Sequence, residues 1–297
     1  MFRSFLVPIL VVLVFAGNAL GEVLRVGVSV IPLEPVVREL GGEWVEVKSL
    51  QQEGDSCSVF EPRPSSISWL ARADLFFRTG VGYETVIMEK VRARFPGLKV
   101  IDLRGAVDTL VQQEHAHHHH GADGHACTVC GDGVESADPH IWTDPHRLSE
   151  IAALISSNLI AALPERAPEL RERLKAFQAR CDEIDNTLEN LLKPYTGRAF
   201  YIYHPALGYF ADRYGLRQIA ISGNGPSPTA KELHQRVVEA RAERVKVVFV
   251  QPQESRKQAE IIAKAVGAEI VEINPMAPDW EENLLEIGEA LKASFAN

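Results

Sequence analysis

Apolar residues in the first hundred positions alternate between short dense runs and helix-like spacing. The dense runs, rich in β-branched residues, are Leu24–Val30, Val45–Leu50, Asp74–Thr79 and Lys99–Leu103. Segments with helical character lie between or after them, around Pro35–Leu40, Ser65–Ala71 and Tyr83–Phe95. Strands that alternate with helices in this way predict βα units on a parallel sheet.

A second set of alternating elements fills the last third of the chain. The expected strands are Ala199–Tyr203, Arg217–Ile221, Val245–Val250 and Ala268–Ile273. The expected helices lie around Leu207–Tyr214, Thr229–Ala242, Ser255–Val266 and Trp280–Phe295. The chain therefore contains two α/β units of similar construction.

One long helix separates these two units. A first helix, Leu148–Leu163, ends before Pro164, and Pro168 marks the start of the next. Steps of four and three then connect Leu170, Leu174, Phe177, Cys181, Ile184, Leu188 and Leu191. This spacing predicts one apolar stripe, with Cys181 as a small buried core residue. The helix ends at Pro194-Tyr195-Thr196-Gly197.

The fold class is therefore α/β, with two lobes that each hold a parallel β-sheet flanked by helices. We expect residues 22–163 to form the N-terminal lobe, residues 164–195 a long rigid connecting helix, and residues 196–297 the C-terminal lobe. In parallel sheets ligands bind outside the carboxyl ends of the strands. A ligand cleft is expected between the lobes.

The first 21 residues have the three regions of a cleavable secretory signal peptide. Arg3 precedes an apolar stretch from Phe5 to Ala16, and small residues follow at Gly17, Ala19 and Gly21. The apolar stretch is short for a membrane span, and an uncleaved anchor is the alternative. The mature chain is expected in the periplasm, as a monomer.

Net charge makes nucleic acid an unsuitable partner. The whole chain carries −9, and loss of Arg3 with the signal peptide leaves −10. The four cysteines show no disulfide framework, although Cys127 and Cys130 are close enough in sequence to pair when metal-free.

A histidine- and cysteine-rich segment lies within residues 112–136. Its metal-binding side chains are His115, His117, His118, His119, His120, His125, Cys127 and Cys130. Imidazole and thiolate are ligands that zinc and neighbouring transition metals prefer. Glycines and few aliphatic residues predict a flexible loop, which collects metal loosely.

Further donor residues follow predicted strands. His204 comes directly after Ala199–Tyr203, and Asn274 directly after Ala268–Ile273. Cys57, Ser58 and Glu61 lie in the segment after Val45–Leu50. His140 sits in the proline-punctuated segment Asp138–Pro145, on the edge of the first lobe. Donors from both lobes predict one tetrahedral site, completed as the lobes close.

Motifs over almost the whole mature chain resemble the zinc- and manganese-type substrate-binding proteins of bacterial ABC transporters. They are Glu61-Pro62-Arg63-Pro64-Ser65, Ala73-Asp74-Leu75, Thr79-Gly80, Asp138-Pro139-His140-Ile141-Trp142, Tyr203-His204-Pro205-Ala206, Tyr209-Phe210, Tyr214-Gly215-Leu216 and Pro226-Ser227-Pro228. The long helix and the histidine-rich insertion resemble the zinc branch.

The resemblance implies a ligand set, which this chain matches in half of its positions. His140 and His204 match two histidine ligands of the family. Ser58, preceded by Cys57, stands where a histidine is usual, and Asn274 stands where a carboxylate is usual. Cys57 as a ligand and Cys57 as a buried thiol remain open, and Glu61, Glu272 or Asp279 are alternative sources of the carboxylate.

The function implied is capture of a transition metal, most simply zinc, and its delivery to an inner-membrane ABC permease for import. Zn²⁺ is then the transported ligand, and no covalent chemistry is expected. The alternative is a periplasmic metal buffer that works through the histidine- and cysteine-rich segment. A zinc hydrolase is disfavoured, because no His-Glu-x-x-His motif occurs in the sequence.

Overall fold

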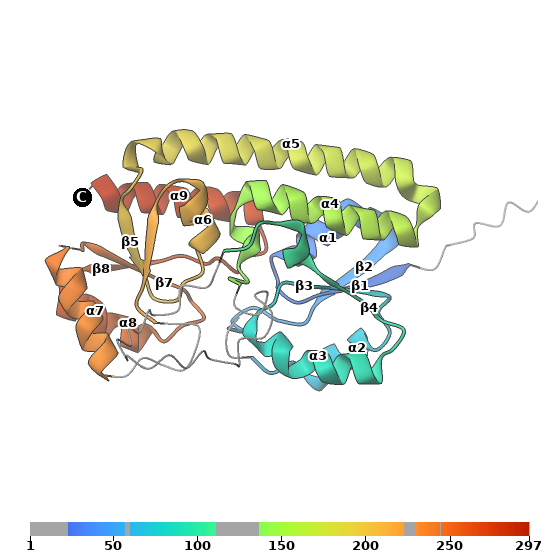
Figure 1. The fold of residues 1–297 in the computed structure, drawn as a ribbon, viewed down its shortest axis with the longest axis horizontal. Helices are drawn as coiled ribbons and strands as arrows, with labels where there is room; N and C mark the ends of the chain where they lie inside the picture. The colour runs from blue at the N-terminus through green and yellow to red at the C-terminus, as the bar shows by residue number, and fades with distance from the viewer. Residues whose placement is uncertain (1–22, 57–59, 111–136, 223–229, 244, 297) are drawn as a thin grey trace, which may run out of the picture.

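A computed structural model describes residues 23–56, 60–110, 137–222, 230–243 and 245–296. It shows two lobes side by side, each built on a four-stranded parallel sheet, beneath a layer of helices (Figure 1). The predicted fold class is confirmed. The division of the chain at residues 163 and 195 stays a prediction.

The first sheet has the strand order β2-β1-β3-β4. Its strands are β1 (Leu24–Val28), β2 (Val45–Ser49), β3 (Leu75–Arg78) and β4 (Lys99–Asp102). The helices of this half are α1 (Leu33–Gly41), α2 (Pro64–Leu70) and α3 (Gly82–Arg94). Val26 of β1 pairs with Val47 on one side and Leu75 on the other, which makes β1 a central strand. Successive strands are added to one side of β1 and then to the other, so the strand order changes direction between β1 and β3. Ligands usually bind at such a point of a parallel sheet.

The second sheet repeats this order as β6-β5-β7-β8. Its strands are β5 (Ala199–Ile202), β6 (Arg217–Ala220), β7 (Val247–Val250) and β8 (Glu269–Glu272), and its helices are α6 (Gly208–Arg213), α7 (Ala230–Ala242) and α8 (Arg256–Val266). All four residues of β7 are buried. Val247 and Phe249 join the core shared with the first lobe, whereas Val248 and Val250 join a smaller core that also holds residues of α7 and α8. Burial on both faces explains the uninterrupted apolar run of this strand.

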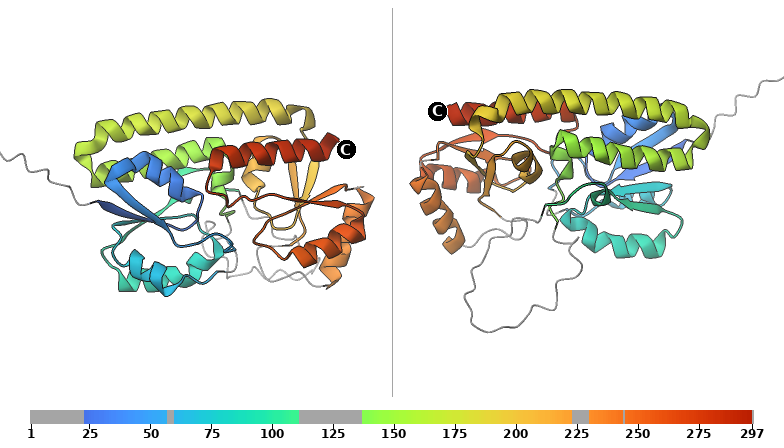
Figure 2. Two further views of the ribbon diagram at one scale, coloured as in Figure 1. Left: turned by 180° about the vertical axis from the view of Figure 1, so that it is seen from behind. Right: turned by 45° about the horizontal axis from the view of Figure 1, so that its top comes forward.

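Three further helices cover the upper side of both sheets: α4 (Pro145–Ala162), α5 (Ala167–Leu192) and α9 (Trp280–Ala296). Figure 2 shows from two other directions that α5 runs over both lobes and that α9 lies under its second half. At 1.5 Å per residue, the 26 residues of α5 span about 39 Å. Close packing between α5 and α9 depends on Gly288, where a Cβ would lie 2.5 Å from a methyl group of Leu188.

The buried stripe of α5 largely follows the predicted spacing, although Leu174 is only partly buried and there are two further differences. Leu170, Phe177, Cys181, Ile184 and Leu188 are buried, but at the end of the helix Leu192 is buried and Leu191 only partly so. The second difference is Asp185, which lies in the buried stripe. Its carboxylate pairs with Arg213 and accepts a hydrogen bond from Tyr214 in the second lobe. A charge is tolerated there because it is paired.

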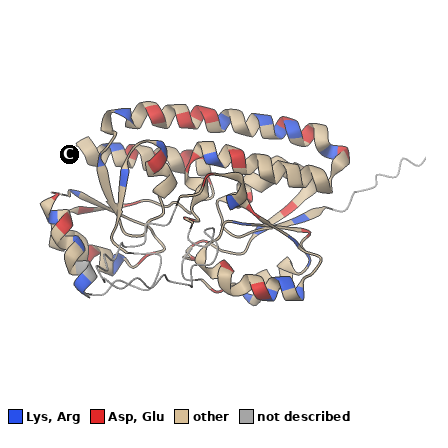
Figure 3. Cartoon of the chain, in the orientation of Figure 1, with Lys and Arg blue, Asp and Glu red and all other residues tan. Residues whose placement is uncertain are grey.

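Charges along α5 change sign from one lobe to the other. Basic residues gather at the end over the first lobe and acidic residues toward the second (Figure 3). Arg173 pairs with Glu43 beside α1, and Arg180 pairs with both Glu39 of α1 and Glu281 of α9. The helix is therefore tied to both lobes by ion pairs as well as by its apolar stripe.

Element boundaries agree with the predictions to within a few residues. The largest difference is α4, which begins at Pro145 rather than Leu148, because Asp144 caps the helix by accepting the His146 N–H at 2.9 Å. Within the described part of the chain, no helix has the length and apolar character needed to cross a bilayer. The predicted signal peptide lies outside the described residues.

Candidate metal centre

Two histidines from different lobes meet between the sheets. His140 lies just before a short 3₁₀ helix, Ile141–Thr143, that leads into α4, and His204 lies two residues after β5. Their Nε2 atoms are 3.3 Å apart, and both side chains are buried, with exposed fractions of 1% and 4%. These residues are 64 positions apart in sequence, and the fold brings them together as expected.

The separation of the two nitrogens fits a shared zinc ion. Zinc–nitrogen bonds of about 2.05 Å at a tetrahedral angle place two ligand nitrogens about 3.3 Å apart. A hydrogen bond between two imidazoles can have the same length, but it would satisfy only these two atoms. The burial, the facing Nε2 atoms and their spacing make the pair a suitable half of a four-ligand site.

Gln251 holds the His204 backbone in place. Its side-chain Oε1 accepts the His204 N–H at 3.2 Å, and its Nε2 donates to the His204 carbonyl at 2.7 Å. Gln251 directly follows β7, so the amide continues the parallel pairing of β5 and β7 beyond the last strand residues. His204 and Gln251 thus lie where the second sheet reverses its strand order, which is where ligands bind in such sheets.

His140 is fixed by its own segment. The Asp138 carboxylate accepts its backbone N–H at 2.9 Å and lies 2.7 Å from Nδ1. Thr143 donates to the His140 carbonyl, and the Trp142 ring packs against the imidazole with 5.3 Å between centroids. Trp142 also donates its indole N–H to the Pro275 carbonyl at 2.8 Å, which joins this segment to the second lobe.

Asn274 forms a turn with its side chain. Its Oδ1 accepts the Met276 N–H at 3.2 Å and the Gln253 side-chain amide at 2.9 Å. The Met276 N–H is always a donor, so the atom that faces it must be the oxygen rather than the amide nitrogen. Both lone pairs of Oδ1 are thereby occupied, and the remaining NH₂ group does not ligate metal.

The alternative carboxylates lie apart from the histidine pair. Glu61, Glu272 and Asp279 are exposed, Glu272 faces Arg256, and Asp279 accepts the Glu282 N–H near the start of α9. Among the residues that the structure describes, no group of three His, Cys, Asp or Glu is arranged to hold a metal. None of these carboxylates therefore joins His140 and His204 in a three-ligand set.

Several predicted ligands lie outside the described residues. They are Cys57, Ser58 and the eight residues of the histidine- and cysteine-rich segment, His115, His117, His118, His119, His120, His125, Cys127 and Cys130. Cys181, by contrast, is a buried core thiol as predicted, and burial raises its pKa to about 12.

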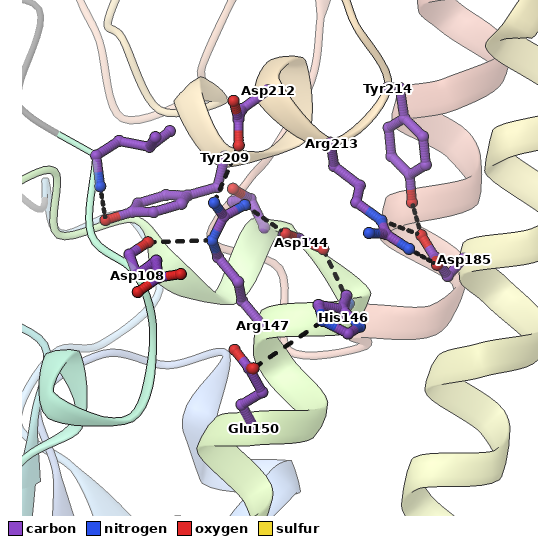
Figure 4. Close-up of polar contacts among 12 residues, drawn as sticks. Asp108, Asp144, His146, Arg147, Glu150, Asp185, Tyr209, Asp212, Arg213 and Tyr214 are labelled. Atoms are coloured by element: carbon purple, nitrogen blue, oxygen red, sulfur yellow. Dashed lines mark hydrogen bonds and ion pairs between the residues drawn. The ribbon is translucent and has the colours of Figure 1, made fainter.

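A polar network between the lobes went unnoticed in the sequence (Figure 4). Arg147 of α4 pairs with Asp144 at 2.7 Å and with Asp212 of α6 at 2.9 Å, and it donates to the Asp108 carbonyl. Its guanidinium also lies 4.9 Å from the centre of the Tyr209 ring. These contacts join the lobes, and only the fold brings them together. Gln251, however, was detectable, because it follows a predicted strand just as His204 does.

The comparisons with known proteins agree with this architecture. Residues 26–292 match the family described as ZnuA, zinc-uptake complex component A, periplasmic. The chain belongs to this family.

Among the relatives of this ZnuA-family chain, the zinc-binding lipoprotein AdcA of Streptococcus pneumoniae is 24% identical over 258 residues, 85% of this chain and 50% of that protein. The chain spans about half the length of the streptococcal relatives it matches. The high-affinity zinc uptake system protein ZnuA of Bacillus subtilis is 24% identical, over 88% of this chain and 81% of the relative. A zinc-bound ZnuA deletion mutant superimposes with a TM-score of 0.80 at 28% identity, covering 92% of this chain and 98% of its own.

Membership of this family confirms the resemblance seen in the sequence. The family consists of zinc-uptake components and not of enzymes, which also confirms the expectation that no covalent chemistry takes place.

Proposed function

We propose that this protein binds one zinc ion between its lobes, with His140 and His204 as ligands, and delivers it to an inner-membrane ABC permease. The observation that carries the proposal is the 3.3 Å separation of two buried Nε2 atoms from different lobes. The zinc named in the descriptions of the ZnuA and AdcA relatives supports the choice of metal.

The remaining ligands belong to this proposal. We assign the third position to the Cys57–Ser58 segment, where the Cys57 thiolate is the stronger donor. The fourth position goes to water, because the Asn274 oxygen is occupied by Gln253 and Met276. A set of two imidazoles and a thiolate favours zinc over manganese, which prefers oxygen ligands.

Location and partner follow from the same assignment. Residues 1–21 direct export and are removed, and the mature chain works as a monomer in the periplasm. The histidine- and cysteine-rich segment raises the local metal concentration near the cleft. Release to the permease requires the two histidines to separate, because they come from different lobes.

The test is zinc stoichiometry and affinity on the mature chain without residues 112–136, under reducing conditions. We expect one tight zinc that is lost in His140→Ala and His204→Ala and weakened in Cys57→Ala. His146→Ala is the matched control, because His146 is an exposed histidine near Glu150 on the adjacent helix. Tight zinc that survives both cleft substitutions would refute the assignment.

The same deletion separates transport from buffering. If the histidine- and cysteine-rich segment is the working part, tight zinc disappears with residues 112–136. Zinc-limited growth of cells that carry the deleted gene then reports on delivery, since a cleft carrier supports growth without the segment and a buffer does not.

A further inference from the structure

The Asp138 carboxylate is shared between a candidate zinc ligand and the opposite lobe. Its Oδ1 accepts the backbone N–H of His140 and lies 2.7 Å from Nδ1 of the same residue. Asp138 is itself buried, with an exposed fraction of 6%. An N–H at Nδ1 that donates to this carboxylate leaves the lone pair on Nε2, the atom that faces His204.

The other oxygen of the same carboxylate rests on Gly208, the first residue of α6 in the second lobe. A Cβ at position 208 would lie 2.5 Å from Asp138 Oδ2, closer than any non-bonded approach allows. The φ of Gly208 is not in the left-handed region, so its backbone does not itself require glycine. Space for the carboxylate is therefore the reason that a side chain is excluded there.

Tyr209, the next residue, completes the contact. Its hydroxyl donates to the Asp138 carbonyl at 2.8 Å and accepts the Leu110 N–H at 3.2 Å. Burial, together with the nearby Asp138 charge, raises the Tyr209 pKa to about 12, so the hydroxyl keeps its proton at physiological pH. The Asp138 segment is thus held by α6 at both its side chain and its backbone.

We propose that Asp138 is a positioning residue for His140, and that Gly208 and Tyr209 of the second lobe hold Asp138 in place. This inference rests on the proposed function, because it concerns the orientation of a ligand of the cleft site. It adds a physical link between the lobes, because His140 presents Nε2 to the metal only while the Asp138 carboxylate is packed against α6.

Breaking the contact between Asp138 and α6 is expected to weaken zinc binding without unfolding the protein. Removing the outer partner of a ligand histidine typically costs 10- to 100-fold in metal affinity. Asp138→Ala removes the carboxylate, and Gly208→Ala displaces it by steric overlap. Both substitutions break the same interaction, so their combined effect should not exceed the larger single effect by more than about threefold.

The experiment measures zinc affinity on the full mature chain by competition with a chelating indicator. The variants are Asp138→Ala, Asp138→Asn, Gly208→Ala, Tyr209→Phe and the double variant of Asp138→Ala with Gly208→Ala. Asp138→Asn keeps an oxygen acceptor for the imidazole and should restore affinity to within a few-fold. Gly105→Ala is the control glycine, since a Cβ there meets no atom within 4 Å.

A second readout distinguishes positioning from general destabilisation. The ¹⁵N shifts of the His140 ring in the zinc-free protein should show the Nδ1–H tautomer in the native chain and a tautomer mixture in Asp138→Ala and Gly208→Ala. If circular dichroism shows that Asp138→Ala or Gly208→Ala does not fold, the zinc affinities of Tyr209→Phe and of the other variant test the positioning role.

Two results would overturn the inference. Native affinity in Asp138→Ala and Gly208→Ala, while His140→Ala abolishes binding, would leave the proposed function intact and remove the positioning role. Losses that multiply in the double variant would show two separate effects rather than one shared contact. By contrast, native zinc affinity in His140→Ala would refute the proposed function itself.

Discussion

Replacing Arg147 with leucine tests whether the polar network in Figure 4 holds the lobes together. The guanidinium, mostly buried at 13% exposure, bridges Asp144 of the first lobe and Asp212 of the second. Asp144 is completely buried, whereas Asp212 is about half exposed. Leucine keeps an apolar side chain at this position but removes every charge contact, including that of the guanidinium with the Tyr209 ring.

The expected loss in the free energy of unfolding follows from the two carboxylates that Arg147 pairs with. The exposed pair with Asp212 contributes at most about 1 kcal/mol. A buried carboxylate that loses its ion-pair partner typically costs 3–5 kcal/mol, but Asp144 keeps the hydrogen bond from the His146 N–H. We therefore expect Arg147→Leu to lower the free energy of unfolding by about 3 kcal/mol, measured by urea denaturation.

A double-mutant cycle identifies the source of this loss. Asp144→Asn keeps the helix cap, because asparagine caps as well as aspartate, but it removes the buried charge. In the Asp144→Asn background, Arg147→Leu should cost only about 1 kcal/mol. A loss below 1 kcal/mol in the native background, or an equal loss in both backgrounds, would refute this account.

The pH dependence gives an independent check with a defined sign. Burial raises the pKa of Asp144 in the folded protein, and Arg147 opposes that rise. Without Arg147 the folded pKa rises further, so the folded state binds this proton more tightly than the unfolded state. Stability then falls as pH increases. The difference in the free energy of unfolding between Arg147→Leu and the double variant with Asp144→Asn should be larger at pH 8 than at pH 5.

Three further predictions concern packing and ligand choice. In a chain whose other three cysteines are replaced by serine, native Cys181 should resist iodoacetamide at pH 8 and react fully in urea, since its pKa is about 12; rapid native labelling would contradict its burial. Gly288→Ala should cost about 1–3 kcal/mol in urea denaturation through overlap with Leu188, and an unchanged midpoint would show that α5 and α9 separate easily. Asn274→Ala should change zinc affinity less than about threefold, because its oxygen serves the turn; a tenfold loss would make it a ligand.

The strand and helix periodicities in the sequence were sufficient to predict the two lobes, and the strand-end rule located His204. The buried side of α5 was predicted less completely. The predicted stripe did not include Asp185, because nothing in a helical pattern reveals that Arg213 and Tyr214 will reach it from another lobe. The burial of Leu192 in place of Leu191 reflects local packing at the end of the helix.

The site was predictable only in its individual residues. His140 was found through a motif, but its 3.3 Å approach to His204 depends on how the lobes pack. The same holds for the contact between Asp138 and Gly208, which are 70 positions apart. Pairwise distances of this kind arise from tertiary structure, so sequence patterning indicates the candidates and not their arrangement.

The placement of α9 after the strands of both sheets has a consequence for the order in which these elements are made and folded. The first sheet is complete by Asp102 and the second by Glu272, so each can form before Trp280–Ala296 has emerged. The Leu188 side of α5 stays uncovered until then, since its partner Gly288 belongs to that last helix. A nascent chain therefore carries an exposed apolar stripe until α9 has emerged, and the packing of α9 removes this aggregation hazard.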